Sequence, residues 1–235
     1  MTDLTDAHVL VVGATGGLGS AIARQLVRAG ATLTISGRRV DVLQELADEL
    51  GDAVKATVAV DVTLPGSPAQ IIEGATADGR TLDGVVYAAG VVAFGPLSEL
   101  DDDVLDELLL ANFVAPVRLA RAALSTLGKG AFLVHLSAIV AEAPTTGMAA
   151  YSASKAALTA FDTAVRGELR RSGVRVLDAR PPHTETGLAG RPISGSAPRL
   201  PEGLQPDAVA DRVVRAIIDD ERDLGPAAFA TGPDL

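Results

Sequence analysis

The sequence contains no cysteine and no tryptophan, and it has three histidines among 235 residues. The absence of cysteine excludes disulfide bonds and thiolate metal ligands, and the scattered histidines form no cluster of metal-ligand spacing. We therefore expect no bound metal. Basic residues are also few, because 20 Lys and Arg stand against 30 Asp and Glu and give a formal charge of -10. Non-specific nucleic-acid binding requires clustered basic side chains, so no nucleic-acid partner is expected.

Long apolar runs are missing as well. No segment reaches the roughly 20 apolar residues that a membrane-spanning helix needs, and residues 1–6 lack the basic start of a secretory signal. These absences predict a cytoplasmic protein with no membrane partner. Apolar residues nevertheless make up 48% of the chain and charged residues 21%, which is enough to bury a full core.

Short β-branched runs alternate along the chain with longer segments of helical period. Strands are expected at residues 8–12, 32–36, 54–60, 84–88, 132–136 and 174–179. Helices are expected at residues 17–29, 42–50, 101–127, 151–172 and 206–219. This order predicts an α/β fold with a parallel sheet covered by helices on both faces. The expected architecture is a doubly wound, Rossmann-type, three-layer α/β/α arrangement in which residues 1–235 form a single domain.

The segment from about residue 181 to 206 has no clear period and is rich in Pro, Gly and Ser. Long loops in compact domains often act as lids or binding segments. We therefore predict a substrate loop here.

A glycine-rich turn follows the first predicted strand and opens the first helix. Missing side chains in such a turn allow the backbone to approach a diphosphate at the helix N-terminus. A glycine-rich turn can also be a plain strand-to-helix connection, so it indicates a dinucleotide site only together with other motifs. On this interpretation the cofactor-binding residues of the turn are Gly13, Thr15, Gly16, Gly17, Leu18 and Gly19.

The second predicted strand ends without the carboxylate that usually binds a free ribose 2′-hydroxyl. Arg38 and Arg39 stand there instead, and their guanidinium groups suit a 2′-phosphate. They predict NADP as cofactor, with NADPH preferred over NADH, unless both only solvate the start of a helix. Asp61 and Val62, after the third strand, are expected at the adenine, and the alternative for Asp61 is to cap the next turn.

Tyr151 and Lys155 lie four residues apart, hence on one face of a helix and one turn from each other. A cation beside a phenol favours the phenolate, so we expect Lys155 to lower the Tyr151 pKa. Tyr151 would then donate a proton to an alkoxide, or accept one in the reverse direction. An exposed pair on a solvated helix face is the alternative.

Together these motifs resemble the short-chain dehydrogenase/reductase family, from about residue 8 to residue 219. The family's Thr-Gly-x-x-x-Gly-x-Gly loop is similar to residues 12–19, its Asp-Val pair to residues 61–62, and its Tyr-x-x-x-Lys to residues 151–155. The resemblance implies that Ala89 and Gly90 contact the cofactor, that Asn112 is the active-site asparagine, and that Thr186 contacts the nicotinamide carboxamide. It also implies a homodimer or homotetramer.

The chain departs from the family pattern at several positions. Val12 and Ala88 replace polar residues, and Pro182 replaces a glycine, next to His183, for which we expect a local hydrogen bond. The family's carbonyl-polarising serine falls on Ala138, directly after Ser137. We favour Ser137 in this role, because one residue of slack in the loop at 141–147 would bring it to the site. Without that slack its side chain points to the other face of the strand.

The sequence therefore predicts an NADP-dependent oxidoreductase that interconverts a carbonyl and a secondary alcohol by hydride transfer. Its predicted catalytic residues are Asn112, Ser137, Tyr151 and Lys155. Apolar residues near the site, such as Val92, indicate a small apolar substrate. The alternative is a non-catalytic NADP-binding sensor or scaffold of the same fold, which Ala138 and Pro182 motivate.

Overall fold

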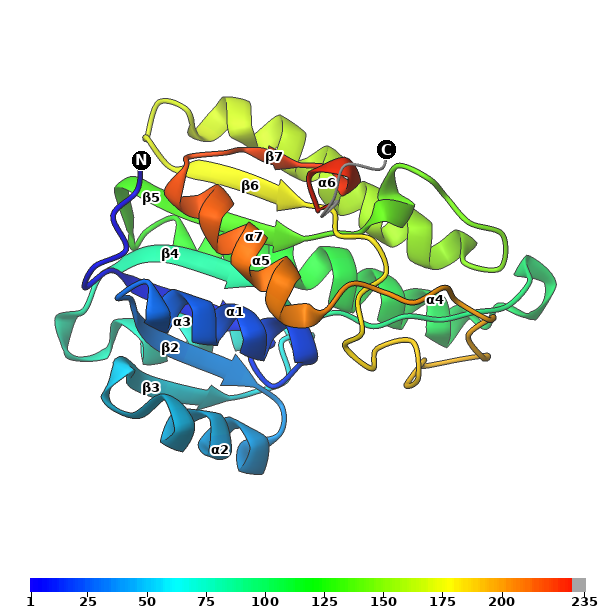
Figure 1. Cartoon of the computed structure of the whole chain (residues 1–235), viewed down its shortest axis with the longest axis horizontal. Helices are drawn as coiled ribbons and strands as arrows, with labels where there is room; N and C mark the ends of the chain where they lie inside the picture. Colours follow the sequence, from blue (N-terminus) through cyan, green and yellow to red (C-terminus); the bar gives the residue numbers. More distant parts are fainter. Residues whose placement is uncertain (230–235) are drawn as a thin grey trace.

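A computed structural model of the chain describes residues 1–229 (Figure 1). The strands are β1 His8–Val12, β2 Thr32–Gly37, β3 Val54–Ala59, β4 Leu82–Tyr87, β5 Leu127–Leu136, β6 Arg175–Ala179 and β7 Asp223–Leu224. The helices are α1 Gly17–Arg28, α2 Val40–Leu50, α3 Ser67–Thr76, α4 Asp102–Leu109, α5 Ala115–Ala123, α6 Ala149–Leu169 and α7 Pro206–Ile218. All seven strands join one parallel sheet in the order β3-β2-β1-β4-β5-β6-β7.

The central strands are buried on both faces, as the run of five buried residues in β1 illustrates. Alternate residues of β1 face opposite sides of the sheet, as the period of two requires. Val9 and Val11 pack with α1, α2 and α7, whereas Leu10 and Val12 pack with α3 and α5. The predicted doubly wound α/β architecture with helices on both faces is confirmed.

The chain reverses its direction of winding at β1, which pairs with β2 on one side and with β4 on the other. At such a switch point the chain continues to opposite faces of the sheet after the two strands, and ligands bind beyond the carboxyl ends of the strands. Here the loops approach closely, because a Cβ added to Gly13 would lie 2.5 Å from the Ala89 nitrogen. Gly13 also has a φ of +82°, which favours glycine. The fold therefore brings the glycine-rich turn and the segment after β4 together.

One predicted helix, at residues 101–127, is interrupted in the structure. A π-helical turn, η4 Leu110–Val114, separates α4 from α5. Pro116 has no N–H for the carbonyl of Asn112 four residues earlier, which accounts for the change of register there. The acidic start of this segment does cap α4, since the Asp101 carboxylate accepts a hydrogen bond from the Asp103 N–H at 2.8 Å.

Two elements, α3 and β7, were not expected from the sequence, and β5 begins earlier than expected, at Leu127. The 181–206 segment contains no helix or strand until α7, and two isolated bridges hold it, Ala93 to Ser194 and Thr184 to Leu204.

Within residues 1–229 no helix is long and apolar enough to cross a membrane. Across the same residues, no group of three or more His, Asp or Glu is placed to hold a metal ion.

The contact between β4 and β5 gives a stability test. A Cβ on Gly84 would lie 2.1 Å from the ring of Phe132, which is fully buried, so Gly84→Ala forces the ring to shift. We expect a loss of about 1–3 kcal/mol in the free energy of unfolding, measured by urea denaturation. Gly128→Ala in β5 is the matched control, since its Cβ would meet nothing within 4 Å. Equal urea midpoints for the two variants would contradict this packing.

Candidate active site

Asn112 is fully buried in the π-helical turn η4, and its amide group is held on both sides. Its Oδ1 accepts a hydrogen bond from the Val91 N–H at 3.0 Å, and its Nδ2 donates to the Val91 carbonyl at 3.0 Å. The same Nδ2 donates to Ser154 Oγ at 3.0 Å, and Ser154 lies on α6 beside Lys155. Asn112 therefore ties the segment after β4 to the helix that carries Tyr151.

Tyr151 and Lys155 lie in the first turns of α6, and both are buried, so they are not an exposed pair on a solvated face. The Lys155 Nζ donates to the carbonyl of Leu136 at 2.8 Å, at the carboxyl end of β5. Gly90 leaves room beside it, because a Cβ there would lie 2.9 Å from Asn112 Oδ1 and 3.4 Å from Lys155 Nζ. The structure therefore brings Asn112, Tyr151 and Lys155 together.

Burial shifts the pKa of each group in the direction that favours its neutral form. It raises the Tyr151 pKa to about 12, whereas the sequence analysis expected Lys155 to lower it. Burial also lowers the Lys155 pKa to about 8, although the nearby Asp178 carboxylate opposes that change. Desolvation of the phenol thus outweighs the neighbouring cation, which forms its hydrogen bond with Leu136. Tyr151 is consequently a protonated phenol at neutral pH.

Ser137 does not face Tyr151, and the expectation for it needs correction. Its hydroxyl donates to the Asp178 carboxylate and accepts from Thr159 Oγ1 at 3.1 Å. The strand ladder continues past β5, because the Ser137 N–H bonds to the carbonyl of Ala179, the last residue of β6, and the Ile139 N–H bonds to the carbonyl of Pro181, each at 3.0 Å. The loop therefore does not reorient the Ser137 side chain, and Ala138 packs in the cluster that contains Tyr151. The position of the polarising hydroxyl therefore carries a methyl group.

The glycine-rich turn after β1 has the features of an anion cradle. Helix α1 begins after Gly16 with no side-chain cap and no acidic residue in its first turn, so its first N–H groups lack a side-chain acceptor. A Cβ on Gly17 would lie 3.0 Å from Thr186, and one on Gly19 would lie 2.2 Å from the Gly13 carbonyl. These residues fit a cofactor diphosphate. The predicted cofactor residue Thr186 lies against the turn at Gly17, next to Leu18 in the sequence.

The two arginines that follow β2 make different contacts. Arg39 Nη2 donates to the Thr15 carbonyl at 2.6 Å and so braces the glycine-rich turn. Arg38 lies 3.8 Å from Asp61, and its side chain is 64% exposed, so the guanidinium is available to another anion. Burial would raise the Asp61 pKa, but hydrogen bonds from Thr63 and the charge of Arg38 lower it. Asp61 thus caps its turn, as its alternative role proposed, and Val62 beside it is buried.

The loop after β6 is held by local bonds. His183 lies 3.4 Å from Glu185, and Glu185 accepts a hydrogen bond from the Gly203 N–H at 2.8 Å. The Pro182 carbonyl accepts from Thr184 Oγ1 at 2.9 Å. The His183 side chain thus has Glu185 as a local neighbour, and its expected hydrogen bond stays a prediction.

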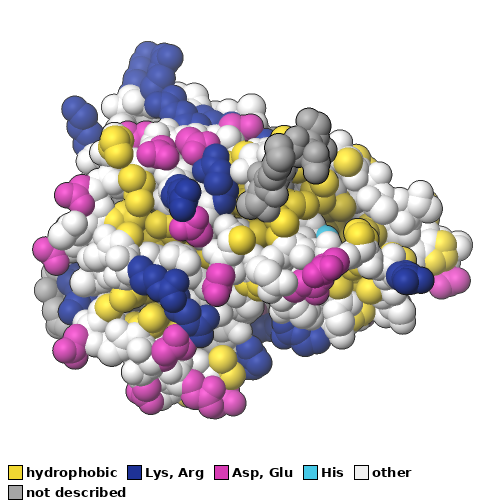
Figure 2. Space-filling view, in the orientation of Figure 1, with side chains coloured by type: hydrophobic (Ala, Val, Ile, Leu, Met, Phe, Trp, Pro, Cys, Tyr) yellow, Lys and Arg dark blue, Asp and Glu magenta, His cyan; other side chains and the backbone are white. Residues whose placement is uncertain are grey.

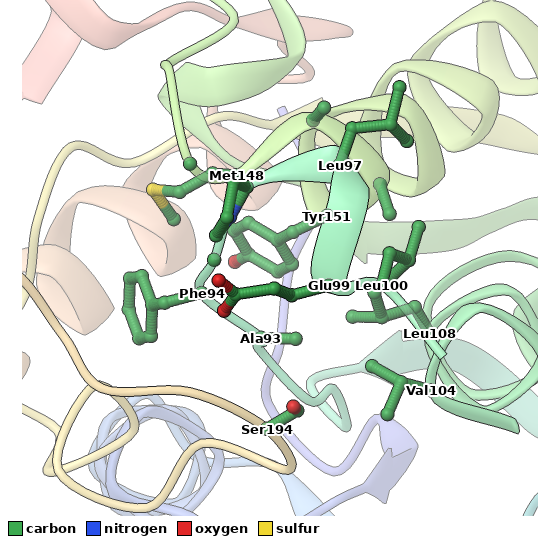
Figure 3. A pocket seen from close by; sticks show the side chains of 15 residues that line it. Ala93, Phe94, Leu97, Glu99, Leu100, Val104, Leu108, Met148, Tyr151 and Ser194 are labelled. Atoms are coloured by element: carbon green, nitrogen blue, oxygen red, sulfur yellow. The ribbon is translucent and has the colours of Figure 1, made fainter. Parts of the chain in front are cut away.

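A shallow, open pocket lies beside Tyr151 (Figure 3). Its walls come from the segment after β4, from α4 and from the start of α6. The lining side chains are mainly apolar, as Figure 3 shows, and Glu99 is the one charged residue among them. The wider surface shows apolar side chains in a hollow on the right of Figure 2, while acidic and basic side chains are interspersed elsewhere on that face. The pocket residues are Ala93, Phe94, Gly95, Pro96, Leu97, Glu99, Leu100, Val104, Leu108, Gly147, Met148, Ala149, Ala150, Tyr151 and Ser194.

The sequence analysis missed three residues that the structure places at or beside the site. Ser154 bonds to Asn112, Glu99 lines the pocket, and Asp178 bonds to Ser137, next to the Leu136 carbonyl that accepts from Lys155. A signal existed for Ser154, which is one residue before Lys155 in the recognised motif. Glu99 and Asp178 come from separate elements, so no spacing in the sequence could indicate them.

Comparison with known proteins gives the family. The family model described as short chain dehydrogenase matches residues 7–194. The chain belongs to this family. A relative named sulfoacetaldehyde reductase 2, from Chromohalobacter salexigens, is 36% identical over 184 residues, covering 76% of this chain and 73% of its own length. The short-chain dehydrogenase described here is therefore an oxidoreductase of the short-chain dehydrogenase/reductase type.

Two solved structures support the same conclusion. A short-chain dehydrogenase from Sphingobium yanoikuyae in complex with NADPH has a TM-score of 0.82 and 26% identity, covering 93% of this chain and 87% of its own. An angucycline C-6 ketoreductase with bound NADP has a TM-score of 0.84 and 25% identity, covering 96% and 95%. Both similarities extend over nearly the whole short-chain dehydrogenase.

The buried Lys155 gives a prediction that needs no substrate. Its pKa is about 8 in the fold against an ordinary 10.5, so between these values the unfolded chain holds more protons than the folded one. The unmodified protein should therefore gain stability relative to Lys155→Met as the pH rises from about 8 to about 10.5, by up to about 3 kcal/mol. Urea denaturation across this range measures the difference. Lys129→Met, at an exposed lysine, is the control, and a pH-independent difference for Lys155→Met would contradict the assignment.

Proposed function

We propose that this short-chain dehydrogenase is an NADPH-dependent reductase of small, uncharged, apolar carbonyl compounds. The observation that carries the proposal is a buried Tyr151 that lines an apolar pocket, with Lys155 one turn further along α6 and Asn112 bonded to Ser154 of the same helix. A phenol hydroxyl can donate its proton to a developing alkoxide, and we propose carbonyl reduction as the working direction.

The residues of the chain divide the work of the proposed reaction. When bound, NADPH supplies the hydride for the carbonyl carbon. The Tyr151 hydroxyl donates a hydrogen bond to the carbonyl oxygen and then its proton, so that an alcohol and a phenolate result. The Lys155 ammonium stabilises this phenolate and would hold the nicotinamide ribose, while Asn112 positions α6 through Ser154. We also propose that Asn112 holds a water molecule that connects Lys155 to solvent.

Ala138 leaves the position of the family's polarising serine without a hydroxyl. We propose that no serine polarises the carbonyl and that the Tyr151 hydroxyl is its main donor. Among the lining residues, only Ser194 carries another hydroxyl, and it belongs to the loop after β6. A reactive carbonyl is therefore a better candidate substrate than a hindered ketone.

The pocket also favours a substrate without negative charge. Sulfoacetaldehyde, which the name of one relative specifies, carries a sulfonate, and binding it calls for a cation. No Lys or Arg lines the pocket beside Tyr151, and Glu99 adds a negative charge there. An aromatic or aliphatic carbonyl compound fits Phe94, Leu108 and Met148 better.

Oligomerisation belongs to the same proposal. Small side chains on α6, including Ala160 and Ala164, are exposed and permit close packing against another helix. A homodimer or homotetramer formed through such helices agrees with the family resemblance.

Tyr151→Phe tests the mechanism, because it removes the proton and little volume. We expect about a 10²- to 10⁴-fold loss of kcat with an unchanged dissociation constant for NADPH. The assay follows NADPH oxidation with a panel of uncharged aldehydes, ketones and quinones, together with sulfoacetaldehyde as the anionic member. Near-full turnover by the variant would overturn the mechanism. Tight NADPH binding with no turnover of any compound by the unmodified protein would favour the sensor or scaffold alternative instead.

Cofactor choice is tested by a pair of neighbouring substitutions. Arg38→Ala should weaken NADPH roughly tenfold more than NADH, because it removes a charge-assisted contact with the 2′-phosphate. Arg39→Ala is the matched control, since Arg39 braces the turn through Thr15 and should affect both cofactors alike. Dissociation constants from fluorescence titration decide between them. Equal affinity of the unmodified protein for NADPH and NADH would refute the preference.

A further inference from the structure

A layer of buried polar side chains lies between α6 and the strands β5 and β6, beneath the proposed active site. Its members are exposed by 6% or less and come from three elements and the segments that follow them. Burial of polar and charged groups is costly unless they are paired, so such a layer calls for an explanation. The layer comprises His135, Ser137, Lys155, Asp162, Asp178 and Arg180.

Contacts in this layer converge on the peptide that joins Leu136 to Ser137. The Leu136 carbonyl accepts the hydrogen bond from Lys155 Nζ at 2.8 Å. On the other side, the Ser137 hydroxyl donates to Asp178, and the Ser137 N–H donates to the Ala179 carbonyl at 3.0 Å. The acceptor of the lysine is thus fixed through Ser137 to β6.

The carboxylates around Arg180 outnumber its single positive charge. Arg180 donates to Asp178, to Glu142 and to Asp223, the last at 2.7 Å and 3.1 Å. One guanidinium is therefore shared by three carboxylates, and Arg166 adds a further bond to Asp223 at 3.2 Å. Asp178 is fully buried and is the carboxylate of this group that bonds to Ser137.

We propose that Asp178 is a positioning residue for Lys155: through Ser137 it fixes the Leu136 carbonyl, and across this connection its buried negative charge stabilises the ammonium. The catalytic consequence rests on the proposed function, because a charged Lys155 favours proton release by Tyr151. The structural part does not depend on it. Ser137, which cannot serve the substrate, has its role here.

Other charged or titratable groups around Lys155 are few and stay unchanged in the test. Tyr151 precedes it by one turn on α6, and Arg180 lies behind Asp178. Asp162, also on α6, pairs with His135 at 2.6 Å; burial raises the Asp162 pKa, and the Asp178 charge contributes to that rise. Asn112 contributes a neutral amide from η4.

The experiment compares Asp178→Asn with Asp223→Asn, which removes the same charge from the far end of Arg180. Each is combined with Lys155→Met, and the stability difference with and without Lys155 is measured by urea denaturation from pH 5 to pH 11. In the unmodified protein this difference should begin to rise at about pH 8. In Asp178→Asn the rise should begin roughly one pH unit or more lower, whereas Asp223→Asn should leave it near its original position.

Ser137→Ala separates position from charge, because it breaks the bond to Asp178 and keeps the carboxylate. We expect a several-fold lower kcat with an unchanged pH profile, while Asp178→Asn should move the alkaline limb of kcat to lower pH. An unshifted stability transition in Asp178→Asn would overturn the counter-charge, and an unchanged kcat in Ser137→Ala would overturn the positioning. If Asp178→Asn fails to fold, the Ser137→Ala result still decides. If no carbonyl compound is turned over, the proposed function fails, yet the stability transitions still test the counter-charge.

Discussion

The burial of one ammonium group organises this molecule. Lys155 is 5% exposed and points its Nζ at the carboxyl end of β5, where the Leu136 carbonyl accepts its hydrogen bond. A buried ammonium is costly unless other groups compensate for its lost hydration. Gly90 has no side chain to crowd this group, since a Cβ there would lie 3.4 Å from Nζ, and the Asp178 charge favours the ammonium. The lowered pKa of Lys155 shows that the compensation is incomplete.

The doubly wound sheet makes this arrangement possible. At the switch point between β1 and β4 the glycine-rich turn approaches the segment at Ala89 without a Cβ in the way. The π-helical turn then directs Asn112 inward, toward Val91 and Ser154.

Most of the sheet was predictable, because buried parallel strands read as continuous β-branched runs in the sequence. Helix α3 was less so, since Pro68 and Gly74 interrupt its helical pattern, and β7 has only two residues. The break at η4 could have been inferred from Pro116, whose effect on a carbonyl four residues earlier follows from its covalent structure. Asp178 and Glu99 were beyond the sequence, because their importance comes from contacts between distant segments.

Ser137 shows how a local rule decides between neighbouring residues. Side chains alternate along a strand, so Ser137 and Ala138 cannot both face Tyr151 while the ladder continues through Ile139. The expectation for Ser137 assumed an insertion in the next loop. The hydrogen bonds to Ala179 and Pro181 show that the strand continues regularly, so the alternation holds.

The loss of a hydroxyl at residue 138 changes what the remaining groups have to do. A single hydrogen-bond donor to a developing oxyanion contributes about 3–4 kcal/mol in other enzymes, so the proposed reaction depends more heavily on Tyr151. A phenol with a pKa of about 12 is a weak acid, and its proton leaves readily only if a positive charge is close when the phenolate forms. Electrostatic interactions are stronger in the interior than in water. A counter-charge that keeps Lys155 protonated thus acts on the same step from which the hydroxyl is missing, which links the buried layer under α6 to the chemistry above it.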